Sequence, residues 1–130
     1  QIIVMQTDDI ATHEQNPFPG RVYNEVGGPN VYNDMQTDYS GSAVTSANFF
    51  AVLKGEEDQL DEGQQSSKRV IKAGPNDRIL VYFAGFGSRG FLAMPSYPYD
   101  QIYADDLSAA VKGMAAGNAS STFKSMLLVL

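Results

Sequence analysis

The sequence predicts an α/β fold with a mostly parallel β-sheet flanked by helices. Three observations lead to this prediction: apolar runs at both ends of the chain, a third apolar run near residue 80, and two amphipathic segments between these runs. Strands that alternate with helices are typical of parallel sheets, because each helix carries the chain back to the start of the next strand. With 130 residues, the chain is long enough for one domain and too short for two.

The strand predictions depend on short runs of apolar and β-branched residues. These runs are residues 2–5, 79–84 and 126–130, and residues 91–94 are expected to form a further short strand after a turn. Continuous apolar runs indicate strands that are buried on both faces, as in parallel sheets. A domain seldom begins or ends inside such a strand, because ladder partners would be lost. We therefore expect residues 1–130 to be a single-domain segment of a longer chain, incomplete at both ends.

Two helices are predicted from capping residues and periodicity. Thr45 has the side chain of an N-cap, and Gly55 is placed to end the first helix. In the second helix Asp105 or Asp106 is expected to be the cap, apolar residues recur at helical spacing from Leu107, and the helix ends near residue 117.

A long stretch rich in Asn, Pro and Gly separates the first strand from the first helix. It includes Asn16-Pro17, Pro19-Gly20 and Gly27-Gly28-Pro29-Asn30, which are typical of turns. We expect an extended loop here, with a small hairpin near residues 21–23.

Charge and composition exclude several classes of function. The chain has 15 acidic and 9 basic residues, a net charge of −6, which disfavours binding to nucleic acid. No apolar run reaches the roughly 20 residues that a membrane-spanning helix needs. Without cysteine and with His13 as the single histidine, these residues offer neither a thiolate nor a multi-histidine metal site. We expect no metal and no cofactor.

Three polar or glycine-rich features could carry chemistry, and each has a plainer interpretation. Residues 85–90 match G-x-G-x-x-G, but a strand follows where a dinucleotide site needs a helix, so a glycine-rich turn is predicted. Asp8 and Asp9 are adjacent, so their side chains diverge, and we expect a loop-capping role through backbone N–H groups. His13 lies in a polar loop and is expected to be a solvated surface residue.

One further motif is a modification signal. Asn118-Ala119-Ser120 fits the pattern for N-glycosylation, which matters only if the protein enters the secretory pathway.

Many spaced motifs in one order resemble the legumain family, the asparaginyl endopeptidases. They include Asp8-Asp9-Ile10-Ala11, Asn16-Pro17-Phe18-Pro19-Gly20, Asp38-Tyr39-Ser40-Gly41, Asn48-Phe49-Phe50-Ala51-Val52-Leu53-Lys54-Gly55, Gly74-Pro75-Asn76-Asp77 and Gly87-Ser88-Arg89-Gly90. The resemblance covers nearly the whole chain. It implies a caspase-like fold and a cysteine–histidine dyad, in which a thiolate attacks the carbonyl and an imidazole moves the proton.

The resemblance also places the catalytic residues, and here the chain departs from the family. The family histidine directly precedes the Gly of Gly-Ser-x-Gly, and this position is Phe86. Phenylalanine cannot transfer a proton or stabilise a thiolate. Gly87 is retained, and its N–H could serve an oxyanion hole. The family nucleophile lies a few residues beyond the strand at 126–130, so no dyad residue is expected within this segment.

Three hypotheses follow. The first is a legumain-like domain that has lost catalysis and acts as a binding or structural module for protein or peptide partners in a larger assembly. The second is an active asparaginyl endopeptidase whose nucleophile lies beyond Leu130 and whose base is supplied elsewhere, with His13 as the single imidazole here. The third is a secreted structural or adhesive protein that resembles the family by chance.

The first hypothesis carries two further expectations. By family resemblance, the protein is expected in the endomembrane system, vacuolar or lysosomal, or outside the cell. We also expect Phe86 to pack partly into the cleft that the imidazole would occupy, which would contribute on the order of 1.5–3 kcal/mol.

Overall fold

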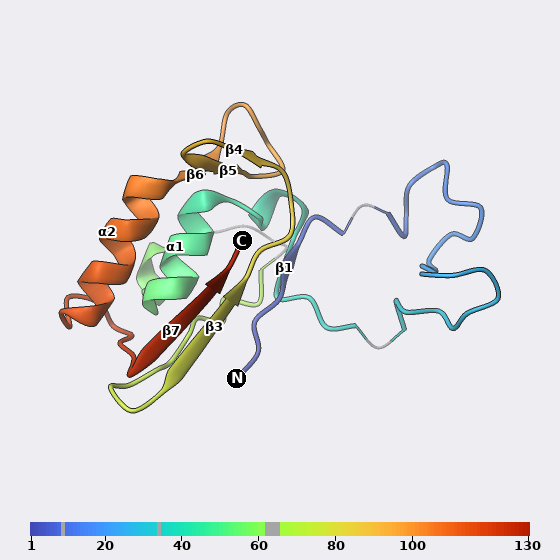
Figure 1. Ribbon diagram of the computed structural model, residues 1–130. Coiled ribbons are helices and arrows are strands. Elements are labelled where there is room, and N and C mark those ends of the chain that lie inside the picture. Colours follow the sequence, from blue (N-terminus) through green and yellow to red (C-terminus); the bar gives the residue numbers. More distant parts are fainter. Residues whose placement is uncertain (9, 34, 62–65) are drawn as a thin grey trace.

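The computed structural model describes residues 1–8, 10–33, 35–61 and 66–130, and its centre is a pair of parallel strands (Figure 1). β3 (Arg78–Tyr82) pairs with β7 (Ser125–Val129) in parallel, from Arg78 opposite Ser125 to Tyr82 opposite Val129. A second parallel pair joins β1 (Met5–Gln6) and β2 (Tyr39–Ser40). The parallel pairs with their helices confirm the predicted α/β fold.

A small antiparallel sheet follows β3 along the chain. It has the order β4 (Gly87–Ser88), β5 (Phe91–Ala93) and β6 (Gln101–Tyr103). β5 confirms the short strand predicted at residues 91–94, whereas β4 and β6 were not predicted.

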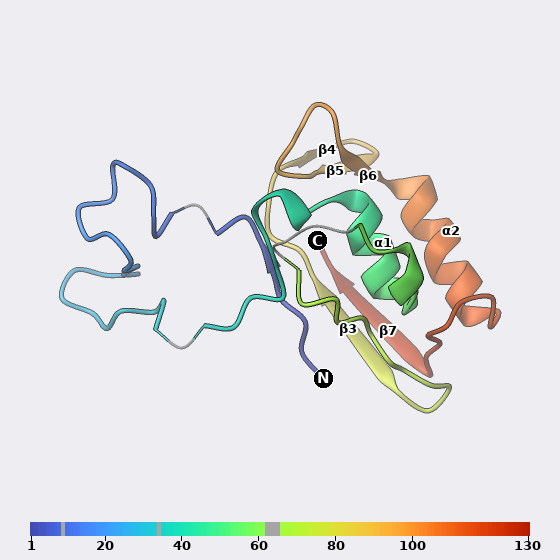
Figure 2. The same ribbon diagram turned by 180° about the vertical axis from the view of Figure 1, so that it is seen from behind.

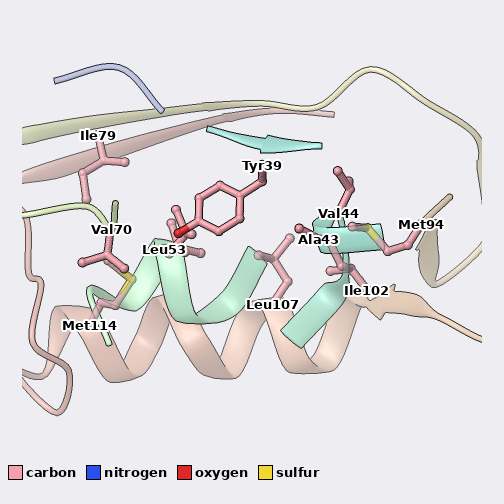
Figure 3. Packing of buried hydrophobic residues seen from close by; sticks show 11 residues of the cluster. Tyr39, Ala43, Val44, Leu53, Val70, Ile79, Met94, Ile102, Leu107 and Met114 are labelled. Atoms are coloured by element: carbon pink, nitrogen blue, oxygen red, sulfur yellow. The ribbon is translucent and has the colours of Figure 1, made fainter. Parts of the chain in front are cut away.

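Two α-helices lie on the same face of the β3–β7 pair (Figures 1 and 3). They are α1 (Ser46–Lys54) and α2 (Ala104–Ala115), and two short 3₁₀ turns, η1 (Gly41–Ala43) and η2 (Glu57–Gln59), flank α1. No helix within the described ranges has both the length and the apolar character to cross a bilayer.

α1 begins and ends where the sequence predicts. The Thr45 side chain accepts a hydrogen bond from the Asn48 amide at 3.1 Å, which satisfies one of the free N–H groups of the first turn. Gly55 ends the helix in the left-handed conformation, with φ of 74°.

The start of α2 corrects the sequence prediction. Tyr103 is the N-cap residue and makes no side-chain capping bond, while Asp105 and Asp106 lie within the first turn. There the two carboxylates face the positive end of the helix dipole, so they act through charge and not as caps.

The hydrophobic core lies between the β3–β7 pair and the two helices (Figure 3). Ile79 points from β3 toward the helices, and Met114 of α2 lies beside Val70. Tyr39 is fully buried, and its hydroxyl donates to the Arg69 carbonyl at 2.7 Å, so its polar end is satisfied.

The opposite face of the β3–β7 pair is open to solvent, which corrects the expectation that these strands are buried on both faces. Successive side chains of a strand point to opposite faces. Ile79 is 7% exposed, whereas Leu80 is 66% and Tyr82 is 72% exposed. In β7, Leu127 is 61% exposed. Both α-helices pack on one side, so the apolar residues of the other side remain uncovered among the described residues.

The first predicted strand is much shorter than its apolar run. Only Met5 and Gln6 pair as β1, and Ile2 is 79% exposed. The carboxylate of Asp38, beside β2, holds this end of the chain: it accepts from the Val4 amide at 3.0 Å, from the Ser67 hydroxyl at 2.8 Å and from Arg69 at 2.9 Å.

These contacts also set the charge state of Asp38. Burial alone would raise the pKa of its carboxyl, but the hydrogen bonds from Val4, Ser67 and Arg69, with the guanidinium charge, outweigh burial and lower the pKa below its ordinary value.

The long loop between β1 and β2 extends away from the rest of the chain in both views (Figures 1 and 2). Asparagine side chains organise it: the Asn16 amide donates to the carbonyls of Ala11 and Arg21, and the Asn30 side chain accepts from Val22. The predicted hairpin near residues 21–23 is reduced to one antiparallel bridge between Tyr23 and Asn30.

Candidate functional site

The candidate site lies where β3 and β7 end. In open α/β sheets, ligands bind beyond the carboxyl ends of the strands. The Phe83 amide donates to the Val129 carbonyl at 2.8 Å, so the two strands stay together to this edge. The chain then runs on through residues 83–86, with a bend at residue 85, into β4 of the separate antiparallel sheet (Figure 1).

Phe86 is 88% exposed at this edge. The expectation that its ring packs into a cleft is therefore wrong for the structure described. The turn is held through the backbone, since the Phe86 carbonyl accepts from the Ala93 amide at 2.9 Å. The ring presents an apolar surface and neither donates nor accepts a proton.

The backbone N–H of Gly87 is oriented away from β5. In an antiparallel ladder, hydrogen-bonded and non-hydrogen-bonded residue pairs alternate. The hydrogen bond from the Ala93 amide to the Phe86 carbonyl makes Phe86 and Ala93 a hydrogen-bonded pair. The next pair, Gly87 and Leu92, is therefore a non-hydrogen-bonded pair, and its N–H groups point away from each other. A side chain at Gly87 would place its Cβ 3.0 Å from the Phe91 carbonyl oxygen, so glycine suits this close approach.

A cavity of about 470 Å³ opens beside this turn. It lies between the antiparallel sheet, α2 and the end of β7, and apolar groups predominate in its lining, with Lys112 as the charged group. Phe86 is not among the described residues that line it; Ser88, Phe91, Leu107, Val111, Leu128 and Leu130 are.

The sequence did not indicate this cavity, because its walls come from separate elements. Leu107 and Val111 were recognised as one face of a helix, but the position of that helix against β5 and β7 follows from packing alone. The short strand at Gln101–Tyr103, whose Ile102 also lines the cavity, had no detectable signal.

His13 is exposed in the long loop between β1 and β2, as expected of a solvated residue. Its Nδ1 accepts a hydrogen bond from the Gln15 amide at 3.2 Å. The loop extends away from β3 and β7 in both views (Figures 1 and 2), so the structure does not bring this imidazole to the turn at Phe86.

Asp8 differs from its predicted role. Its carboxylate accepts from the Tyr32 hydroxyl, at 2.8 and 3.0 Å, rather than from backbone N–H groups. This hydrogen bond, together with desolvation and the negative charge of Asp8, raises the pKa of Tyr32. Asp9 lies outside the described residues. Within residues 1–8, 10–33, 35–61 and 66–130, no three acidic or histidine side chains are grouped as a metal site.

The G-x-G-x-x-G segment forms the first half of a β-hairpin, with β4 at Gly87–Ser88 and the predicted glycine-rich turn confined to Arg89-Gly90. Residues 85–90 lead into β5, and the next helix begins only at Ala104. A helix N-terminus for a pyrophosphate is therefore absent from this described segment. Asn118, the predicted glycosylation position, is exposed just after α2.

Comparison with known proteins gives a consistent result. The sequence model of the Peptidase C13 family matches residues 1–130. A "Vacuolar-processing enzyme" of Phaseolus vulgaris is 44% identical over 127 residues, 98% of this chain and 24% of that protein. The "Vacuolar-processing enzyme beta-isozyme" of Arabidopsis thaliana is 43% identical, also over 98% of this chain and 24% of the relative.

Animal proteins show the same similarity. "Legumain" of Rattus norvegicus is 43% identical over 114 residues, 88% of this chain and 25% of that protein. The chain thus spans about a quarter of the length of the curated relatives it matches. A match over the whole chain contradicts the hypothesis of a chance resemblance.

Proposed function

Because the chain belongs to the Peptidase C13 family, the family of legumain, we propose that it is a legumain-type domain without catalytic activity. Its role in this proposal is that of a binding or structural module for protein or peptide partners within a larger assembly. The observation that carries the proposal is Phe86, an exposed aromatic ring at the carboxyl end of the central strands, where the family resemblance places the catalytic histidine.

The chemistry of this position supports the proposal. A cysteine peptidase needs a group that takes the thiol proton and later returns a proton to the leaving amine. Phe86 has no titratable atom, and His13 lies in the extended loop. Positioned general acids and bases typically contribute 10²- to 10⁴-fold to rate. Loss of the base therefore removes most of the activity even when a nucleophile is present.

The alternative is an active asparaginyl endopeptidase with its nucleophile beyond Leu130 and its base supplied from elsewhere. Two features favour it: the N–H of Gly87 points away from β5, as an oxyanion hole requires, and an apolar cavity lies beside it. A former enzyme that lost its base would also retain a backbone N–H of this kind, so these two features do not decide between the hypotheses.

The same proposal includes a location. The plant relatives are named for vacuolar processing. We extend this to the chain as a location in the endomembrane system, vacuolar or lysosomal, or outside the cell.

The direct test is an assay of the complete protein that contains this chain, with a fluorogenic peptide that has Asn before the scissile bond, at acidic and neutral pH. The Phaseolus vulgaris relative is assayed in parallel as a positive control. We expect no turnover from the wild type. The reciprocal His→Phe substitution in the relative should lower kcat/KM by about 10² to 10⁴ or more.

Two variants separate the hypotheses. Phe86→His should not restore turnover unless a cysteine follows the last strand of the complete chain. Turnover by the wild type that disappears when such a cysteine is replaced would overturn the proposal. If that turnover also disappears in His13→Ala, then His13 is the substitute base.

A further inference from the structure

The turn after α2 presents an asparagine to solvent. α2 ends at Ala115, and Gly117 turns the chain with φ of 77°. The Asn118 amide donates to the Gly113 carbonyl at 2.9 Å, which fixes the backbone. The Asn118 side chain is exposed and makes no hydrogen bond to another described residue, so its carboxamide nitrogen is free to react.

The two residues after Asn118 complete a sequence pattern for N-glycosylation. Asn118-Ala119-Ser120 has Ser two positions after Asn and no proline between, and no other Asn of the chain has this pattern. Ser120 is exposed as well. Residue 121 is anchored: the Ser121 amide donates to the Lys54 carbonyl at 2.8 Å and its hydroxyl donates to the Ile71 carbonyl at 2.6 Å. A short, accessible segment thus lies between two fixed points.

This segment is at the opposite end of the sheet from the candidate site. β7 starts shortly after this turn, at Ser125, and its carboxyl end lines the same cavity as Ser88 of β4. A bulky group on Asn118 would therefore leave both Phe86 and Gly87 uncovered.

We propose that Asn118 carries an N-linked oligosaccharide. A lipid-diphosphate-linked oligosaccharide is the donor: the Asn118 Nδ2 forms a bond to the anomeric carbon, the bond from that carbon to the diphosphate oxygen breaks, and the amide loses one proton. Such a group is bulky, polar and confined to the protein surface. The inference depends on the endomembrane location proposed above and not on the loss of catalysis.

The test uses the complete protein expressed from its natural coding sequence in eukaryotic cells. We expect peptide N-glycosidase to increase its gel mobility by one step. Asn118→Gln and Ser120→Ala should show that faster mobility without enzyme treatment, and Ser120→Thr should keep the slower form.

A matched control distinguishes a failure at Asn118 itself from a failure of the proposed endomembrane location. Val26 is fully exposed, and Val26→Thr creates a second acceptor triplet at Asn24 in the extended loop. This change is made in the Asn118→Gln background. If the Asn24 triplet is glycosylated and the wild-type Asn118 is not, the inference is wrong and the location stands. If neither triplet is glycosylated, the proposed location is wrong and the inference fails with it.

Discussion

The two faces of the β3–β7 pair have similar residues and opposite surroundings. One face presents Ile79, which is 7% exposed, to the helices (Figure 3). The other presents Leu80, Tyr82 and Leu127, which are 66%, 72% and 61% exposed. Aliphatic or aromatic residues occupy both faces, so the strands alone do not show which side is covered. The amphipathic helices decide this, because both place their apolar stripes on the same side.

The largest expected effect separates the two faces directly. Ile79→Ala should lower the free energy of unfolding by about 2–5 kcal/mol, because it removes buried contacts and leaves a cavity. Leu80→Ala, one residue along the same strand, should change it by only about 0.5 kcal/mol. Urea unfolding of the two purified variants measures the difference. Equal losses would mean that the open face is covered in the complete protein.

A second prediction concerns how the covering helix α1 ends. An alanine at Gly55 would need φ of 74°, and its Cβ would overlap the Ser121 hydroxyl and lie 2.7 Å from the Ile71 carbonyl oxygen. Left-handed backbone costs an L-residue roughly 1–2 kcal/mol, and the clash adds to this. Gly55→Ala should therefore lower the free energy of unfolding by more than about 2 kcal/mol.

Gly27→Ala is the matched control for this prediction. Gly27 also has positive φ, 76°, but open space around its Cβ position. Thermal unfolding of both variants isolates the clash. The same loss in the two variants would show that α1 is not held against Ser121.

A third prediction concerns the polar cluster of Asp38, Ser67 and Arg69 beside β2. The folded-state pKa of Asp38 is lowered, so this residue contributes stability at pH values above its unfolded pKa of about 3.9, and this contribution is lost as pH falls through the folded value. Asp38→Asn should lower the free energy of unfolding by about 1.5–3 kcal/mol at neutral pH.

The same variant should lose part of the pH dependence of stability below about pH 4. Unfolding curves recorded from neutral to acidic pH test both effects. Asp58→Asn, at an exposed position, is the control and should keep the wild-type profile. An unchanged acidic slope in Asp38→Asn would mean that Asp38 does not titrate abnormally.

Features that depend on residues close together in the sequence were predicted more often than features that depend on distant ones. The cap at Thr45, the end of α1 at Gly55 and the apolar run that forms most of β3 are local features, and all three were predicted. The antiparallel sheet was predicted only in part. β5 was expected, but β4 and β6, which have two and three residues, were not, even though β4 pairs with β5 across a tight turn. The open face of β3 and β7 was missed because apolar periodicity cannot show whether a second layer is present.

For the candidate site, the residue types were predictable and their surroundings were not. The family resemblance pointed to Phe86, a side chain that cannot transfer a proton, and to Gly87, whose N–H could serve an oxyanion hole. The sequence could not show that the Phe86 ring is exposed, because exposure depends on how the turn leaves β3 and enters β4. The partner of Asp8 was missed for the same reason: Tyr32 is distant in the sequence.

The smallest expected effect is at the candidate site itself. Phe86 is 88% exposed, so Phe86→His should change the free energy of unfolding by no more than about 0.5 kcal/mol. A ring packed in a cleft would instead contribute about 1.5–3 kcal/mol. Urea unfolding of wild type and variant decides between these values. A large loss would mean that the Phe86 ring is packed in the complete protein and contributes to its stability. A small loss would agree with the exposed ring seen here.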